Sequence, residues 1–234
     1  MYKRVLLKLS GEQLAGKFDS GVDTELMAWL AGQIKPVVAQ GTEVVIMVGG
    51  GNYARGAQLA GHGIGRVTAD NIGMLATIMN AVALSDVFNA HGVTARALSI
   101  VRAEQIADYF THRRALGDLT KGHVVIAAGG TGRPYVTTDT AALSFALELE
   151  CQVVFKATKV DGVYDKDPAK HADAVLRPEI SFDDAVADSA IRVMDKAALG
   201  LAAEYKLPVL VFNAMQDGAI ARACQGEAIG TRIG

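Results

Sequence analysis

The chain has 234 residues, of which 50% are hydrophobic, and its 23 Lys and Arg residues nearly balance 25 Asp and Glu residues. This length suits one large α/β domain or two small lobes that share a sheet. The balanced charge, without a basic stripe, argues against a nucleic-acid partner. No apolar stretch approaches the roughly 20 residues of a membrane span, and the first apolar run is interrupted at Lys8, too soon for a signal peptide.

The two cysteines, Cys151 and Cys224, are far apart in the sequence and form no C-x-x-C motif. This usage is typical of a reduced, cytoplasmic protein, and we predict that both thiols are buried and take no part in chemistry. The five histidines have no metal-binding spacing such as H-x-x-x-H, so the sequence predicts no metal-ligating residues.

Short apolar runs recur along the chain, and each ends in a loop rich in glycine or polar residues. Because the runs are continuous rather than alternating, they indicate strands covered on both faces, as in parallel sheets. In chain order the predicted strands begin at Arg4, Val44, Ala95, Val124, Val153 and Leu207.

Helical spacing of apolar residues appears between these runs. Alternating strands and helices imply a doubly wound sheet with helices on both faces, and such sheets bind ligands beyond the carboxyl ends of their strands. The predicted helices are Thr24–Gln40, Asp70–Ala90, Asp139–Glu150, Ser181–Ser189 and Asp195–Tyr205.

The stretch "VVIMVGGGN", Val44 to Asn52, delivers three bare glycines at the end of a strand. Glycines let backbone N–H groups approach a ligand closely, yet neither G-x-x-x-x-G-K-[ST] nor G-x-G-x-x-G fits here. A second glycine loop, "GGTG", follows the strand at Val124. We expect these loops to converge on one edge of the sheet, with the triple glycine in the floor of a pocket.

Charged residues near these loops favour an anionic ligand, with phosphate the best fit. Lys8 lies inside an apolar strand, and Arg55 follows the glycines, where a guanidinium can bind phosphate oxygens. Asp70 and Asp139 stand at predicted helix starts, where an N-cap is as good an interpretation as a catalytic role. Two glycine loops suggest two phosphate-bearing ligands and phosphoryl transfer, although an anion-binding or storage protein would show the same loops.

Six segments in order carry a family resemblance: "YKRVLLKLSGE", "GGGNYARG", "ADNIGMLATIMNAVAL", "GTGRPYVTTDTAA", "KATKVDGVYDKDPAK" and "VMDKAA". Together they closely resemble bacterial uridylate (UMP) kinases of the amino-acid kinase family, from Tyr2 to about Asn213. The resemblance implies a three-layer α/β/α sandwich with a central, mostly parallel sheet. It also implies transfer of the γ-phosphate of ATP to UMP, dependence on Mg²⁺ and a homohexamer.

The same resemblance implies a single domain over residues 1–234, with UMP and the subunit interface served mainly by the N-terminal part and ATP by the part from about residue 150. Lys8, Asp139 and Arg55 would be catalytic: Lys8 would neutralise charge on the transferred phosphoryl group, and Asp139 would orient lysines and metal. Lys156 and Lys159 are equally placed to assist Lys8. The implied ATP-binding residues are Lys8, Leu9, Ser10, Gly11, Gly51, Arg55, Thr158, Tyr164 and Asp167.

On the acceptor side, the resemblance assigns Asp70 to the ribose of UMP and the segment at residues 131–138 to the rest of the nucleotide. The helix Asp70–Ala90 is apolar all round, so we expect it to be buried in a subunit interface; burial inside one subunit is the alternative. The implied UMP-binding residues are Gly50, Asp70, Thr131, Gly132, Arg133, Pro134, Tyr135, Val136, Thr137 and Thr138.

Several positions depart from the family pattern. "AGKFDSGVD", from Ala15 to Asp23, stands where many members read closer to G-x-x-G-F-G-I-D, and Ser85 stands where some members carry a basic residue. Activation by GTP and inhibition by UTP are therefore open. Arg133 replaces a frequent asparagine and adds a positive charge near the acceptor.

Two other functions fit parts of the pattern. One is another kinase of the same fold, acting on carbamate, an amino-acid carboxylate or isopentenyl phosphate, because a fold alone does not fix a substrate. The other is a non-catalytic oxyanion-binding protein. Such a protein has no need to keep Lys8, Asp139 and the "KATKVDG" loop together, and the "GTGRPYVTTD" loop favours a nucleoside monophosphate as the acceptor.

Overall fold

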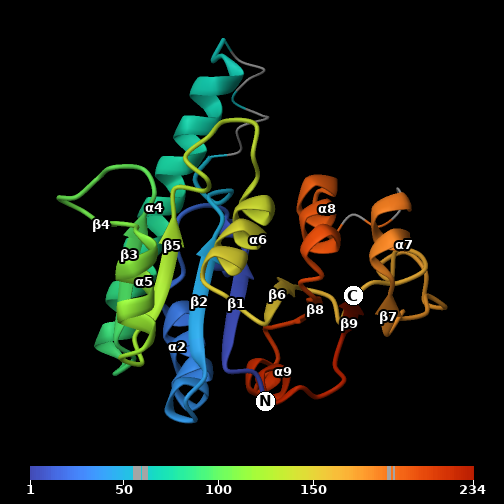
Figure 1. Ribbon diagram of the computed structural model, residues 1–234. Helices are drawn as coiled ribbons and strands as arrows, with labels where there is room; N and C mark the ends of the chain where they lie inside the picture. The colour runs from blue at the N-terminus through green and yellow to red at the C-terminus, as the bar shows by residue number, and fades with distance from the viewer. Residues whose placement is uncertain (55–58, 60–62, 189–190, 192) are drawn as a thin grey trace.

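The computed structural model describes residues 1–54, 59, 63–188, 191 and 193–234. These residues form a nine-stranded sheet in the order β4-β3-β5-β2-β1-β6-β8-β9-β7 (Figure 1). Among the described pairings, β8 with β9 is antiparallel and the others are parallel. The strands are β1 (Arg4–Leu9), β2 (Glu43–Val48), β3 (Ala95–Ser99), β4 (Asp108–Tyr109), β5 (Val124–Ala128), β6 (Val153–Thr158), β7 (Glu179–Ile180), β8 (Val209–Asn213) and β9 (Thr231–Ile233).

Helices cover both faces of this sheet, which confirms the predicted three-layer α/β/α sandwich. Helices α2, α4 and α9 pack on one face, and α5, α6, α7 and α8 pack on the other, each with its own apolar core. The helix bounds are α1 (Gly11–Leu14), α2 (Thr24–Ala39), α4 (Arg66–Ala90), α5 (His112–Leu119), α6 (Thr138–Glu148), α7 (Phe182–Ala187), α8 (Lys196–Tyr205) and α9 (Ala219–Gln225).

The alternation of side chains along β1 decides where its lysine points. Val5 and Leu7 face the layer of α2 and α4, whereas Leu6 faces the layer of α6. Because successive side chains of a strand point to opposite faces, Lys8 shares the side of Leu6. The sequence therefore directs a cation out of an apolar strand towards α6.

All six predicted strands are present, with ends that differ by one or two residues. The sequence did not predict β4, β7 and β9, because strands of two or three residues are too short to show a period. It also missed α1, α5 and α9. Helix α4 begins at Arg66, four residues before the expected Asp70, and α7 ends at Ala187. Ser189, where that helix was expected to end, lies outside the described residues.

Helix α4 requires two corrections. By length and composition it is apolar enough to cross a membrane, contrary to the expectation that no stretch approaches that size. It packs against α2, β3 and β5, however, and Leu84 and Phe88 are fully buried, as in the core of a globular protein. Leu75 and Met79 are 53% and 50% exposed, so the alternative of complete burial within one subunit is wrong.

Both cysteines are buried, as predicted. Burial raises the pKa of the Cys151 thiol and of the Cys224 thiol to about 12. Because the thiolate is the nucleophilic form, neither residue is equipped for nucleophilic chemistry.

Candidate active site

The carboxyl ends of four neighbouring parallel strands form the site. Strands β5, β2, β1 and β6 are adjacent in the sheet, so the loops that follow them meet at one edge. These loops are "SGE", the triple glycine, "GGTG" and "KVDG", and they include the two glycine loops that were expected to converge. The predicted convergence is confirmed.

Two lysines and one aspartate lie at the centre of this edge. Lys8 of β1 and Lys156 of β6 are paired in register on neighbouring strands, so both side chains point towards the start of α6. There, Asp139 Oδ1 lies 2.8 Å from Lys8 Nζ and 2.6 Å from Lys156 Nζ. The three side chains are only 7%, 12% and 15% exposed. The cluster carries one more positive than negative charge, which suits an anionic ligand.

The surroundings shift the pKa values of two of these groups. Burial alone would raise the pKa of Asp139, but the charges of Lys8 and Lys156 and their hydrogen bonds outweigh it, so the pKa is lowered. Burial, with the neighbouring charge of Lys8, lowers the pKa of Lys156 to about 8, against the opposing effect of Asp139. A bound phosphate would supply the second negative charge that this pair of lysines lacks.

Asp139 is not the N-cap of α6, contrary to one of the two interpretations of the sequence. The cap is Thr137, whose hydroxyl accepts hydrogen bonds from the backbone N–H groups of Asp139 and Thr140, at 3.1 and 3.2 Å. The Asp139 side chain is therefore free of the capping task and binds the two lysines instead. The positions of Lys156 and Lys159 also differ, because Lys156 joins the cluster and Lys159 is exposed.

The triple glycine serves close packing as well as ligand access. A Cβ on Gly50 would lie 2.6 Å from the carbonyl oxygen of Gly73 in α4, and a Cβ on Gly11 would lie 2.6 Å from the backbone nitrogen of Gly51. Side chains at these positions would push apart the loops after β1 and β2 and helix α4. The backbone of Gly51 is less crowded and lines two cavities.

A buried pair of amides fixes the glycine loop to α4. Asn52 and Asn80 exchange side-chain hydrogen bonds of 2.8 and 2.7 Å, and Asn80 Nδ2 also donates to the carbonyl oxygen of Gly49 at 2.7 Å. Asn80 was not among the residues predicted for the site. Its signal was available, because Asn80 stands between Met79 and Ala81 in an apolar stretch, where an amide is costly to bury without partners.

The smaller of the two cavities, about 140 Å³, lies between the glycine loop, α4 and the loop after β5. It is the candidate acceptor cavity, since it brings together the two segments expected to bind UMP. Thr77 of α4 ties the segments to each other, because its hydroxyl accepts a hydrogen bond of 2.7 Å from the backbone N–H of Gly129. The cavity is lined by Gly50, Gly51, Ala54, Ala69, Asp70, Gly73, Met74, Thr77, Gly130, Arg133, Val136 and Thr138.

Asp70 closes one side of this cavity. Its carboxylate accepts from Arg66 Nε at 2.9 Å and from the backbone N–H of Tyr135 at 2.8 Å, with Tyr135 in the left-handed region at φ 64°. The hydroxyl of Thr131 is buried and has no hydrogen-bond partner in the described part of the chain. Thr131 does not line the cavity itself, but the preceding residue Gly130 does, so the unpaired hydroxyl is a candidate ligand contact.

The other predicted acceptor residues are placed differently. Gly132, Pro134 and Tyr135 belong to the same loop but do not line the cavity, and the hydroxyl of Thr137 is engaged in the cap of α6 and with Asp195. The structure thus brings together Gly50, Asp70, Arg133, Val136 and Thr138.

On the donor side, the predicted residues follow β1 and β6. The Ser10 hydroxyl caps α1 by accepting from the backbone N–H of Gln13 at 3.1 Å, and the Leu9 side chain is fully buried, so Leu9 can offer a ligand only its backbone. The Thr158 hydroxyl donates to the carbonyl oxygens of Val160 and Phe212, at 2.6 and 3.0 Å. Tyr164 is half-buried and Asp167 is exposed. Arg55, expected to bind phosphate, lies outside the described residues.

The larger cavity, about 440 Å³, shares Gly51 and Ala54 with the smaller one and includes Glu12, Asp19 and Lys159. Two cavities that share the backbone of Gly51 are the arrangement expected of two ligands that meet. Together with the lysine pair, this geometry defines an α/β protein with a positively charged cluster at the carboxyl edge of its sheet.

Comparison with known proteins identifies the family to which the chain belongs. A sequence profile of the amino acid kinase family matches residues 3–213, and the chain belongs to that family. Its fold is similar to that of solved UMP kinases from two bacteria. The one from Bacillus anthracis is 37% identical, with a TM-score of 0.91 over 99% of this chain and 96% of that chain.

The UMP kinase from Ureaplasma parvum is 32% identical, with a TM-score of 0.91 over 100% of this chain and 99% of that one. A uridylate kinase from Archaeoglobus fulgidus is more distant, at 28% identity and a TM-score of 0.74 over 98% of this chain and 99% of that chain.

Proposed function

We propose that this protein is a UMP kinase, which transfers the γ-phosphate of ATP to UMP and releases UDP and ADP. The observation that carries the proposal is the cluster of Lys8, Lys156 and Asp139 next to the acceptor cavity. Thr138, the residue before Asp139, lines that cavity. The full-length similarity to solved bacterial UMP kinases supports the choice of acceptor.

The cluster suits phosphoryl transfer because this reaction needs little covalent chemistry from the protein. It needs the two reactants held in line, and positive charge where negative charge spreads over the transferred group. Lys8 and Lys156 supply that charge from neighbouring strands. Asp139 holds both ammonium groups through one oxygen, which keeps two like charges close together in the absence of the substrate.

Mg²⁺ is the metal proposed to accompany ATP. It is usually held by one or two carboxylates together with phosphate oxygens and water, and Asp139 fits this requirement. Both lysines bind its Oδ1, and Oδ2 is the oxygen proposed to face the ion. When bound, the ion would add neutralising charge to the phosphates. Lys8 and Lys156 would still bind and orient the transferred group.

We further propose that residues 1–234 act as one domain in which the N-terminal part binds UMP and the part from about residue 150 binds ATP. The acceptor cavity is lined by residues 50–138, which agrees with this division. Two buried cysteines are consistent with a reducing cytoplasmic location.

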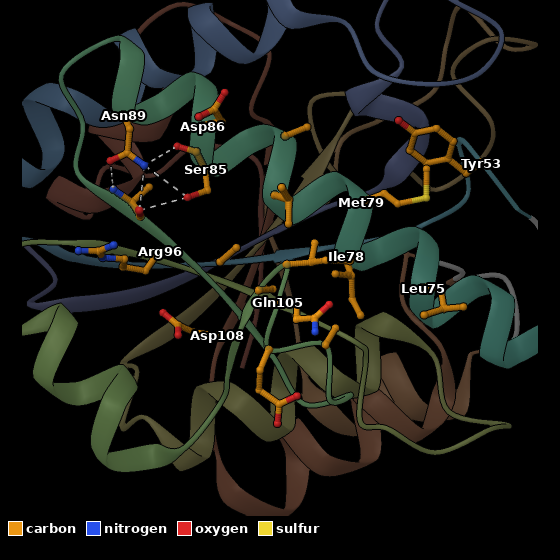
Figure 2. Close-up of a pocket in the computed structure, with 18 residues that line it drawn as sticks. Tyr53, Leu75, Ile78, Met79, Ser85, Asp86, Asn89, Arg96, Gln105 and Asp108 are labelled. Atoms are coloured by element: carbon orange, nitrogen blue, oxygen red, sulfur yellow. Dashed lines mark hydrogen bonds between the residues drawn. The ribbon is translucent and has the colours of Figure 1, made fainter.

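The exposed apolar face of α4 supports the proposed homohexamer. A groove of about 860 Å³ lies beside this helix. Figure 2 shows Leu75, Ile78 and Met79 towards one end of it and Asn89, Arg96 and Asp108 towards the other. Exposed apolar patches of this kind mark interaction sites, and a self-complementary contact of α4 with a second copy would cover it. GTP and UTP are the proposed effectors of the assembly.

An ADP-release assay with UMP, CMP, dUMP, carbamate and acetylglutamate as acceptors tests the proposal. We expect a strong preference for UMP, and the same assay with added GTP or UTP tests the effectors. Turnover with carbamate or acetylglutamate alone would assign the chain to another kinase of this fold. Nucleotide binding without turnover would identify a binding protein.

A further inference from the structure

We propose that Asp195 is a positioning residue for the phosphoryl-transfer site, acting through the hydroxyl of Thr137 on the turn of α6 that carries Asp139. The inference rests on the proposed function and adds a residue to it. Asp195 belongs to the segment "VMDKAA", and neither the lysine cluster nor the two cavities include it.

The carboxylate of Asp195 joins the N-termini of two helices. It caps α8 by accepting a hydrogen bond of 2.9 Å from the backbone N–H of Ala198. It also accepts hydrogen bonds from two hydroxyl groups at the start of α6. Thr140 Oγ1 lies 3.0 Å from Oδ1 and 3.2 Å from Oδ2, and Thr137 Oγ1 donates to Oδ2.

These contacts fix the direction of the Thr137 proton. An ionised carboxylate only accepts hydrogen bonds, whereas a hydroxyl donates one and accepts through two lone pairs. With its proton given to Asp195, Thr137 Oγ1 turns its lone pairs to the backbone N–H groups of Asp139 and Thr140, at 3.1 and 3.2 Å. Asp195 therefore sets the cap of α6 in its capping orientation.

The cap in turn determines where Asp139 stands. Asp139 lies two residues after Thr137, and its own backbone N–H is one of the two capped donors. Its carboxylate must reach Lys8 and Lys156 at once, so a small shift of this first turn changes both contacts. A misplacement of about 1 Å costs on the order of a hundredfold in rate in enzymes generally. Asp195 touches neither lysine and acts only through this turn.

The next residue of α8 provides a matched control. Lys196 Nζ donates to the carbonyl oxygens of Ala185 and Asp188 at 2.8 and 2.6 Å, so it holds the end of α7. Asp195 thus joins the start of α8 to α6, whereas Lys196 joins it to the end of α7. Of these two residues, Asp195 contacts the turn that carries Asp139. Loss of the Lys196 anchor is expected to lower stability without changing the position of Asp139.

The test compares Asp195→Asn, Thr137→Ala, the double variant and Lys196→Gln in the UMP-dependent ADP-release assay. Asparagine caps a helix about as well as aspartate, so α8 keeps its cap in Asp195→Asn. The asparagine NH₂ group, however, can face Thr137 Oγ1 only as a donor, which forces the hydroxyl proton elsewhere. We expect kcat at saturating substrates to fall about ten- to a hundredfold in Asp195→Asn, whereas Lys196→Gln should keep wild-type kcat.

The double variant separates positioning from a general loss of structure, because coupled residues give non-additive effects. If Asp195 acts through the Thr137 hydroxyl, Asp195→Asn lowers kcat little further in the Thr137→Ala background. Additive losses, or wild-type kcat in Asp195→Asn, would overturn the proposal.

Hydrogen exchange keeps this test separate from the proposed activity. The backbone N–H groups of Asp139 and Thr140 should exchange faster in Asp195→Asn than in the wild type, and Lys196→Gln should leave them unchanged. If the wild-type protein does not phosphorylate UMP, the proposed UMP kinase activity is wrong. The exchange rates would still show whether Asp195 orders the first turn of α6. Unchanged exchange in Asp195→Asn would overturn the positioning role whatever the activity.

Discussion

Replacement of Asp139 by asparagine removes the only negative charge from the lysine cluster, with almost no change of shape. In the wild-type protein one carboxylate oxygen binds both ammonium groups, at 2.8 and 2.6 Å. Removal of one partner of a buried ion pair costs about 3 kcal/mol or more, because the remaining charge is left uncompensated. For a chain of this size that corresponds to a fall in Tm of roughly 6–12 °C. We also expect kcat to fall on the order of a hundredfold, or ~2.7 kcal/mol.

The sign of the pH dependence identifies the cause of this destabilisation. Lys156 has a pKa of about 8 in the folded protein, below the ordinary lysine pKa of 10.5. The unfolded chain therefore binds more protons between these two pH values, and the stability of the folded protein rises with pH there. Without Asp139 the pKa of Lys156 in the folded protein falls further. The stability of the variant therefore begins to rise with pH at a lower pH than that of the wild type. The stability difference between variant and wild type should therefore narrow as the pH rises towards 8.

Asp183→Asn is the matched control, because Asp183 occupies in α7 the helix position that Asp139 occupies in α6. Asp183 is exposed, so its loss should cost only about 0.3–1 kcal/mol of interaction with the helix dipole. Thermal unfolding between pH 6 and 9 and steady-state kinetics measure both variants. If Asp139→Asn is as active as the wild type and no less stable than the control, the account of the cluster is wrong.

Four further variants test other parts of the site. Lys156→Met should lose on the order of a hundredfold in kcat without loss of stability, because the pair of Lys8 and Asp139 remains. In the wild type, kcat/KM should fall above a pH of about 8 as Lys156 loses its proton. Thr131→Val should raise the KM for UMP about tenfold and leave Tm unchanged, which calorimetry and kinetics can measure, because the hydroxyl has no partner to lose. Arg55→Ala should lower kcat/KM roughly ten- to a hundredfold; unchanged kinetics would remove it from the site. Leu75→Glu should shift sedimentation towards smaller species, and a wild-type monomer at micromolar concentration would contradict the proposed assembly.

Much of the fold follows from the sequence because buried parallel strands have a strong pattern. The runs at Val44 and Val124 are apolar throughout and end in glycines, so both the strands and the edge they share could be predicted. The strands β7 and β9 could not, since a few residues at the edge of a sheet have no period of their own. Their place depends on pairing with one another and with β8.

The sequence predicted which residues belong to the site better than it predicted how they contact one another. Lys8 was noticeable as a cation in an apolar strand, and the register that pairs it with Lys156 explains why that lysine, rather than Lys159, joins Asp139. The role of Asp139 remained ambiguous in the sequence because an aspartate at a helix start also suits an N-cap. Only the position of the Thr137 hydroxyl resolves the ambiguity.

Contacts between distant segments were out of reach of sequence patterns. The links of Asn52 to Asn80 and of Asp195 to Thr137 join residues that are 28 and 58 positions apart. Each residue alone is an ordinary polar side chain in a loop, within a helix or at a helix start. Its function depends on the tertiary packing that brings the partner within hydrogen-bonding distance.

Transfer of the terminal phosphate is the most direct test of the central claim. The purified protein is incubated with Mg²⁺, UMP and ATP labelled in the γ-phosphate, and the nucleotides are separated by chromatography. We predict that the label appears in UDP in an amount equal to the ADP formed, and that Asp139→Asn slows its appearance on the order of a hundredfold. Label that stays in ATP, or appears only in inorganic phosphate, would contradict the assignment of this chain as a UMP kinase.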